Sequence, residues 1–120
     1  MVCAPRVFAW AEFHQPSIST FSIVARDLKT GEIGVAVQSK FVAVGSVFPY
    51  AKAGIGAVAS QAWGNPRYGP IGLELLAHGK SADEGVGLIT ASDPNPEYRQ
   101  LAIIGNDGNA SMFTGREWMK

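Results

Sequence analysis

Two neighbouring stretches decide the fold of this chain: Thr20-Phe21-Ser22-Ile23-Val24-Ala25 and Ile33-Gly34-Val35-Ala36-Val37. The first alternates with a period of two and the second is rich in β-branched residues, so both patterns favour β-strands. The segment between them, Asp27-Leu28-Lys29-Thr30-Gly31, has the composition of a turn in which Gly31 can adopt a positive φ. We therefore expect residues 20–27 and 32–38 to pair as an antiparallel β-hairpin.

The region that follows the hairpin has too many glycines for a helix and contains Pro49. We expect a short strand near Val47-Phe48 and a second one through residues 55–59. The small residues of this second strand indicate close approach of backbones within a layered structure. Residues 63–70 are expected to form a loop, because Asn65-Pro66 favours a turn.

Two helices are expected next, over residues 69–78 and 82–91. Gly79 stands where a helix-terminating glycine belongs, and Ser81 and Glu84 have the spacing of a capping box at the start of the second helix. A second hairpin then pairs residues 101–104 with residues 110–113. Strands and helices come in blocks, which predicts an α+β fold with both helices on one face of a mainly antiparallel sheet that includes the first hairpin.

Composition places the protein in the class of single soluble domains. The chain has 120 residues, 47% of them hydrophobic, and ten acidic residues balance ten basic ones. Without a basic stripe, nucleic acid is not expected as a partner. The apolar run over residues 7–13 is interrupted by Glu12 and is too short for a signal peptide or a membrane span. We therefore expect a cytoplasmic protein that does not enter a membrane.

The residues that usually bind metals or form disulfides are scarce. Cys3 is the single cysteine, and His14 and His78 are far apart in the sequence, so neither a metal site, a cofactor site nor an internal disulfide is predicted. The composition changes at residues 15–19. We interpret residues 1–19 as a leader or tail and residues 20–120 as the folded domain.

Several motifs in the domain resemble one known family. These are residues 20–27 and 31–41, Ala43-Val44-Gly45, residues 54–59, Gln61-Ala62-Trp63, Asn65-Pro66-Arg67-Tyr68-Gly69-Pro70, residues 72–76, Ser81-Ala82, Asp93-Pro94, Arg99-Gln100 and Thr114-Gly115. Together they are similar to the first half of an uncharacterised bacterial and archaeal family placed in the N-terminal nucleophile (Ntn) hydrolase superfamily. Members of that family are roughly twice as long, so the resemblance implies a domain that is truncated relative to them.

The resemblance implies a four-layer αββα fold and a candidate mechanism. In the superfamily, the first residue of the mature chain is the nucleophile and its own α-amino group is the base. Thr20 is the matching position, and it would become N-terminal when the Ser19–Thr20 bond is cleaved. A free α-amine has a pKa of about 7.7–8.0, so part of it is neutral at physiological pH and can accept a proton.

Further candidate residues follow from the ends of the expected strands. Ser39 and Lys40 end the second strand, and Ser60 and Gln61 follow residues 55–59, where the superfamily places oxyanion donors. Each also has an ordinary explanation, because polar residues are common where strands end and an exposed lysine is usually solvated. Thr20 itself also suits the start of a strand simply through its β-propensity.

The loop over residues 63–70 offers a second candidate site. Asn65, Arg67 and Tyr68 combine an amide, a guanidinium and a phenol, which can bind a polar ligand. Alternatively, Asn65-Pro66 only makes a turn and Tyr68 covers the following helix. Trp63 is expected to be a packing residue.

Three functions are therefore compatible with the sequence. The first is an Ntn-type hydrolase of amide bonds that acts on a small polar or peptide substrate, with Thr20 as nucleophile. The second is a catalytically silent protein of the same fold that binds a small polar ligand near Asn65 and Tyr68. The third is a structural module that completes its core by forming a homo-oligomer, because a chain of this length buries only about two-thirds of its unfolded surface.

Overall fold

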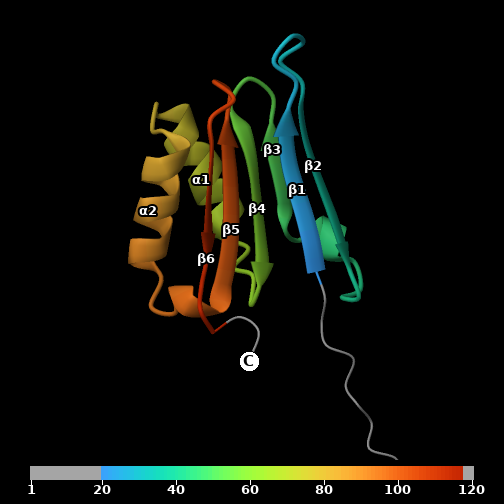
Figure 1. Cartoon of the computed structure of the whole chain (residues 1–120), viewed down its shortest axis with the longest axis vertical. Coiled ribbons are helices and arrows are strands. Elements are labelled where there is room, and N and C mark those ends of the chain that lie inside the picture. The colour runs from blue at the N-terminus through green and yellow to red at the C-terminus, as the bar shows by residue number, and fades with distance from the viewer. Residues whose placement is uncertain (1–19, 118–120) are drawn as a thin grey trace, which may run out of the picture.

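The structure is a computed structural model that describes residues 20–117. The expectations for the leader over residues 1–19, for Cys3 and for His14 lie outside this range. Within it, six strands and two α-helices form an α+β fold with antiparallel sheets (Figure 1). The α+β class is thus confirmed.

The predicted first hairpin is confirmed. Strand β1 (Thr20–Arg26) pairs antiparallel with β2 (Ile33–Ser39), so that Thr20 lies opposite Ser39. In the turn, the carboxylate of Asp27 accepts the backbone N–H groups of Lys29 and Thr30 at 2.7 and 3.0 Å. Gly31 has a φ of 75°, a conformation that glycine adopts without steric cost.

The remaining strands form a second, four-stranded antiparallel sheet. Its strands are β3 (Pro49–Lys52), β4 (Gly56–Ala62), β5 (Arg99–Gly105) and β6 (Ala110–Thr114), and they lie in that order. Two short 3₁₀ turns, η1 (Val44–Ser46) and η2 (Pro96–Tyr98), precede β3 and β5. The helices α1 (Tyr68–Ala77) and α2 (Ala82–Ser92) connect β4 to β5.

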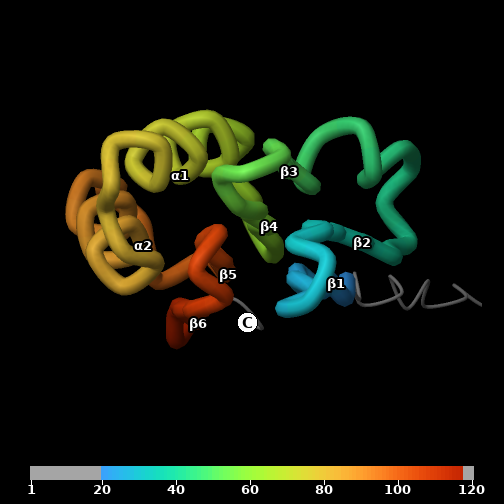
Figure 2. Tube along the Cα trace, turned by 90° about the horizontal axis from the view of Figure 1, so that it is seen from above, coloured from blue at the N-terminus to red at the C-terminus, as the bar shows by residue number. Residues whose placement is uncertain are grey.

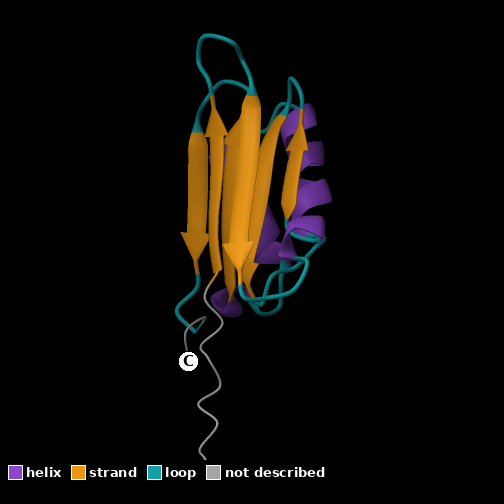
Figure 3. Ribbon diagram, turned by 90° about the vertical axis from the view of Figure 1, so that its right-hand side faces the viewer, coloured by secondary structure: helices purple, strands orange, loops and turns teal. Residues whose placement is uncertain are grey.

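The elements form three layers. The two helices pack on one face of the four-stranded sheet, and the β1–β2 sheet packs mainly on β3 and β4 across the opposite face (Figures 2 and 3). One part of the sequence prediction is therefore wrong: the helices do not cover the sheet that contains the first hairpin. Two separate sheets form because β1 and β2 pair only with each other among the described strands.

The main core lies between the helices and the four-stranded sheet. Val58 and Ile103 are fully buried there, and Leu101, Ile89 and Tyr68 are each 2% exposed. Helix α1 lies close to β4 at Gly72. A Cβ added to this glycine would lie only 2.9 Å from the side chain of Val58. Glycine at this position allows the helix to lie against the sheet, as the small residues in the sequence suggested.

The strand that was expected near Val47-Phe48 is also placed differently. Residues 44–46 form η1, and the strand begins at Pro49 instead. Proline suits the first residue of a strand because its missing N–H is not needed by the ladder. Strand β4 continues to Ala62, three residues beyond the expected end, because it pairs with β5 over its whole length.

The predicted helix signals are confirmed. The Ser81 Oγ accepts the backbone N–H of Glu84 at 3.1 Å, and the Glu84 carboxylate accepts the N–H of Ser81 at 2.9 Å. The backbone hydrogen bond from Ser81 is the main reason that the pKa of Glu84 lies below its ordinary value. Helices α1 and α2 end within one residue of the expected positions, and Gly79 has the positive φ of a helix-terminating residue.

Candidate active site between the two sheets

Thr20 lies at the start of β1 and faces the space between the two sheets. Exposure alternates along β1, so Thr20, Ser22 and Val24 are half-buried while Phe21 and Ile23 face outward. The hydroxyls of Thr20 and Ser39 share a hydrogen bond, with 2.9 Å between Oγ1 and Oγ. The Ser39 Oγ also accepts the N–H of Phe41 at 2.9 Å. These two contacts fix the position of the candidate nucleophile.

Gln61 lies on the sheet face that is directed toward β1. Val58 packs among the helices, so the alternation of β4 turns Ala57, Ala59 and Gln61 to the opposite side, where β1 packs. The side chain of Gln61 is buried, at 7% exposure, and its Nε2 has no hydrogen-bond partner within residues 20–117. An unpaired buried N–H donor is costly, so its presence on the face toward β1 suggests a function.

Ser22 was not singled out from the sequence, and its hydroxyl lies in the same layer. The Oγ atom is buried and has no hydrogen-bond partner in the described part of the chain. Ser22 is two residues from Thr20 on the same face of β1, so both hydroxyls face the four-stranded sheet. The strand period alone could have indicated Ser22, once the inward face of β1 was known.

The strand ends bring further polar side chains to the same end of the molecule. Gln61 pairs with Gln100 on β5, and Gln100 pairs with Thr114 on β6. The Gln100 Nε2 donates to the Thr114 Oγ1 at 3.5 Å. A row of amides and hydroxyls therefore crosses three strands on the face toward β1, at the end where β2 and β4 finish and β5 begins.

Two of the other candidates do not join this row. Ser60 lies on the opposite face of β4, toward the helices, where it is 2% exposed and its Oγ has no partner within the described range. Lys40 follows Ser39 and is exposed. Of the five residues proposed for catalysis, Thr20 and Ser39 are in contact, Gln61 faces them from β4, and Ser60 and Lys40 point elsewhere.

Asn65, Arg67 and Tyr68 lie at the start of α1. The Asn65 Oδ1 accepts the N–H of Arg67 at 3.0 Å, which makes the expected turn, and Arg67 is exposed. Tyr68 is 2% exposed, and its hydroxyl donates to the Asp93 carboxylate at 2.5 Å. This arrangement agrees with the alternative in which the residues form a turn and cover the helix. Ligand binding here remains a prediction.

Asp93 is the centre of a buried polar network that the sequence did not indicate. Its side chain is 3% exposed, and its Oδ2 accepts both the Tyr68 hydroxyl and the Nε of Arg99, the latter at 3.1 Å. Burial raises the pKa of Asp93, but the hydrogen bonds from Tyr68, the Asn95 N–H and Arg99 outweigh it and lower the pKa to about 2. Burial and the bond to Asp93 raise the pKa of Tyr68 well above its ordinary value.

We expect Asp93→Asn to destabilise the protein by about 2 kcal/mol at pH 7. Because the folded-state pKa is depressed from 3.8 to about 2, the ionised carboxylate stabilises the fold above pH 4, and this contribution is lost as the pH falls through 2. Urea unfolding of wild type and variant should therefore give a free-energy difference that shrinks between pH 4 and pH 2. The control Glu74→Gln, at an exposed position of α1, should change stability by no more than about 0.5 kcal/mol. A pH-independent difference would contradict the assignment.

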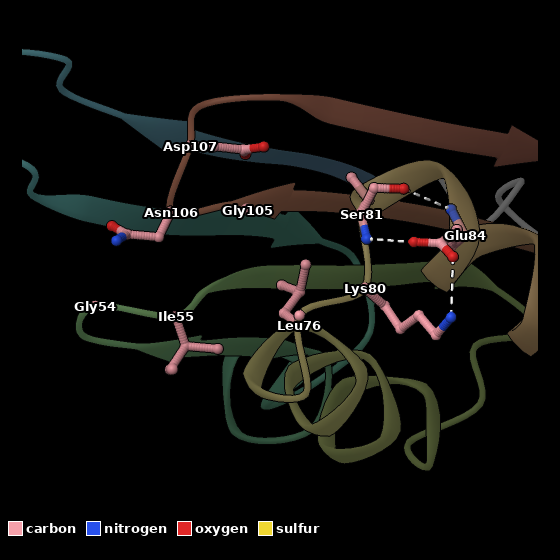
Figure 4. A pocket seen from close by; sticks show the side chains of 11 residues that line it. Gly54, Ile55, Leu76, Lys80, Ser81, Glu84, Gly105, Asn106 and Asp107 are labelled. Carbon is pink, nitrogen blue, oxygen red and sulfur yellow. Dashed lines mark hydrogen bonds and ion pairs between the residues drawn. The ribbon is translucent and has the colours of Figure 1, made fainter.

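A hollow of about 320 Å³ lies at the opposite end of the sheet, where the β3–β4, α1–α2 and β5–β6 turns meet (Figure 4). Most charged groups that line it already have hydrogen-bond or ion-pair partners within the protein. Lys80 forms an ion pair of 3.0 Å with Glu84, which also caps Ser81, and Asp107 accepts from Asn109. The hollow therefore offers few free polar groups to a ligand and is remote from Thr20.

Within residues 20–117, no group of three or more His, Cys, Asp or Glu side chains is arranged to hold a metal ion. No helix in the same range is long and apolar enough to cross a membrane.

A model of the family described as "Family of unknown function (DUF1028)" matches residues 20–120. The chain belongs to the DUF1028 family. No curated protein matches the chain.

A solved structure supports this membership. The crystal structure of protein SPO2555 from Silicibacter pomeroyi, also assigned to DUF1028, superimposes with a TM-score of 0.79 and is 37% identical in sequence. The match covers 84% of this chain and 46% of that protein, so the matched part of the chain spans less than half the length of its DUF1028 relative. Membership of the wider Ntn superfamily stays a prediction, because neither comparison names it.

Proposed function

We propose that this DUF1028 protein is an amide hydrolase of the N-terminal nucleophile type, in which Thr20 becomes the nucleophile after cleavage of the Ser19–Thr20 bond. One observation carries the proposal. The hydroxyl of Thr20 is held by Ser39 between two sheets, and the unpaired amide N–H of Gln61 is buried on the sheet that faces it. A nucleophile and an oxyanion donor are the two groups that acyl transfer needs most.

The proposed reaction follows from these groups. The free α-amine of Thr20 accepts the hydroxyl proton while Oγ1 attacks the substrate carbonyl, and the Nε2 of Gln61 donates to the resulting oxyanion. The protonated amine then gives its proton to the leaving amine, which leaves an ester on Thr20. Water, deprotonated by the same α-amine, hydrolyses the ester and restores the enzyme. Ser39 orients the nucleophile through its 2.9 Å hydrogen bond.

The layer order supports a relationship with the αββα fold. Two antiparallel sheets lie face to face, and helices cover the outside of one of them. A helix layer over the β1–β2 sheet would complete four layers. The outer face of that sheet carries Phe21 and Ile23, which are 65% and 52% exposed and are the side chains that such a layer would cover.

The proposal is tested by the mass of the purified protein. We expect intact-mass spectrometry to show a species that lacks residues 1–19, and N-terminal sequencing to read Thr-Phe-Ser-Ile. Cleavage is required because an acylated nitrogen cannot accept the proton of the hydroxyl at neutral pH. A uniform mass of 12.7 kDa, with activity absent after incubation, would rule out Thr20 as the nucleophile.

We also propose that the chain self-associates through the outer face of the β1–β2 sheet, since Phe21 and Ile23 make an apolar surface there. Sedimentation of wild type should give at least twice the monomer mass, and Phe21→Lys combined with Ile23→Lys should shift it to the monomer. Leu28→Lys is the control, because Leu28 is 76% exposed in the β1–β2 turn and away from this face. A wild type that stays monomeric at high concentration would exclude this association.

A further inference from the structure

Trp63, which the sequence suggested to be a packing residue, lies largely at the surface. Its side chain is 74% exposed, and it lies 6.2 Å from the ring of Tyr98 with an angle of 48° between the ring planes. Tyr98 is itself 43% exposed. Two large aromatic rings are thus presented to solvent at the end of β4, where β5 begins.

The backbone beneath these rings is fixed. The Trp63 N–H donates to the Tyr98 carbonyl at 3.2 Å, and the Arg99 guanidinium donates to the Trp63 carbonyl. Arg99 is held in turn by the buried Asp93. The backbone N–H and the backbone carbonyl of Trp63 are therefore both hydrogen-bonded within the protein. What this residue offers to a ligand is mainly its aromatic ring. Rings on a fixed backbone lose little conformational entropy when they bind.

A strained residue directs Trp63 outward. Ala62 has a φ of 66°, in the left-handed region that non-glycine residues enter only at an energetic cost. Without this turn, Trp63 would follow Gln61 on the same face of β4, because strand side chains alternate. The left-handed residue instead separates the two: Gln61 stays buried, and Trp63 reaches the surface.

The spacing of Gln61 and Trp63 suits a peptide. Two residues separate their Cα atoms by no more than about 7 Å, which is the length of two residues in an extended peptide. A substrate whose carbonyl accepts from Gln61 would therefore have a neighbouring residue within reach of the Trp63–Tyr98 pair at the surface. An aromatic side chain gains most from such a surface, because aromatic rings attract one another beyond what the area they bury contributes.

We propose that the Trp63–Tyr98 pair is a specificity subsite that binds an aromatic side chain next to the amide bond. Its place beside the reacting bond rests on the proposed hydrolase function, whereas binding of an aromatic side chain by the pair does not require Thr20 to react. The ligand class is a peptide with Phe, Tyr or Trp at the neighbouring position.

The test uses N-acetyl-phenylalaninamide and N-acetyl-alaninamide as probes, titrated into the full chain and followed by NMR of the backbone amide and indole N–H groups, so that binding can also be followed in variants that lack Trp63. We expect the phenylalanine probe to bind at least fivefold more tightly and to shift the Trp63 signal. Trp63→Ala should remove this preference, Trp63→Phe should restore most of it, and Leu28→Ala, on an exposed residue of the β1–β2 turn, should leave it unchanged. Thr20→Ala should also leave it unchanged, so that failure of the hydrolase proposal is recognised separately.

Two results would overturn the subsite. One is equal affinity for the two probes. The other is a preference for phenylalanine that survives in a Trp63→Ala variant whose thermal unfolding matches wild type. If the probes bind equally and Trp63→Ala instead lowers the sedimenting mass, the pair is a contact between copies of the chain and the subsite is rejected.

Discussion

Thr20→Ala is expected to leave residues 1–19 attached and to reduce amide hydrolysis by about a thousandfold or more, since removing a catalytic nucleophile has effects of this size. The attachment follows from the chemistry of cleavage. In the proposed cleavage, the Thr20 hydroxyl would attack the preceding carbonyl, the peptide bond would become an ester, and water would hydrolyse that ester. Alanine lacks the hydroxyl, so neither cleavage nor catalysis can proceed. The intact mass of the variant measures the first effect directly.

Thr20→Ser provides the matched comparison, because serine keeps the hydroxyl and should still be processed. Thr30→Ala, in the β1–β2 turn, is the control for loss of a threonine elsewhere. Activity of the processed protein should rise with pH as the α-amine loses its proton, around its ordinary pKa of about 7.7–8.0. Processing that survives in Thr20→Ala would show that another agent cuts the chain and would remove the argument for an intramolecular step.

Gly56→Ala is expected to lower the free energy of unfolding by about 3 kcal/mol. A Cβ at this position would overlap the carbonyl oxygen of Ile104 on the neighbouring strand and would lie 2.6 Å from Cδ1 of Leu76. The leucine tip can move, but the carbonyl belongs to β5, so relief requires the β4–β5 ladder to shift. For a domain of this size the midpoint of thermal unfolding should fall by about 12–24 °C.

Gly87→Ala is the matched control for this substitution. Gly87 lies on the exposed side of α2, and a Cβ there would meet nothing within 4 Å. Alanine should therefore raise stability by about 0.5–1 kcal/mol, because glycine is the weaker helix former. A free energy of unfolding of Gly56→Ala within about 1 kcal/mol of the wild-type value would contradict the close approach of β4 and β5 at this point.

Local signals in the sequence predicted most of the elements. Ser81 and Glu84 cap α2 through bonds that span three residues, and Asp27 with Gly31 forms the first turn within five residues. Such contacts join residues that are close in the sequence, so a short stretch of sequence is enough to predict them. The extent of β4 was not predicted, because its last residues are held by β5, nearly forty positions later. This error mattered for the site, since the longer strand places Ser60 and Gln61 on opposite faces.

The site itself was predicted only in part. Thr20 was identified through the resemblance to a family and Ser39 through its place at the end of the second strand, and the antiparallel register brings their hydroxyls together. Asp93 was missed as the partner of Tyr68 because 25 residues separate them, and no local pattern reports such a contact. Trp63 was misassigned because composition favours burial of tryptophan, while the left-handed turn at Ala62 cannot be anticipated from an alanine.

The pairing of β1 and β2 only with each other has a consequence for local opening. Strands β4 and β5 have a hydrogen-bonded neighbour on both sides, whereas the first hairpin contacts the other sheet through side chains alone. Proteins open locally in units of differing stability. A unit that shares no backbone hydrogen bonds with the neighbouring sheet needs less free energy to open. Amide hydrogens of the hairpin should therefore exchange with solvent faster than those of β4 and β5. The candidate nucleophile thus belongs to the part of the molecule that opens first, and its alignment with Gln61 depends on how often that part is closed.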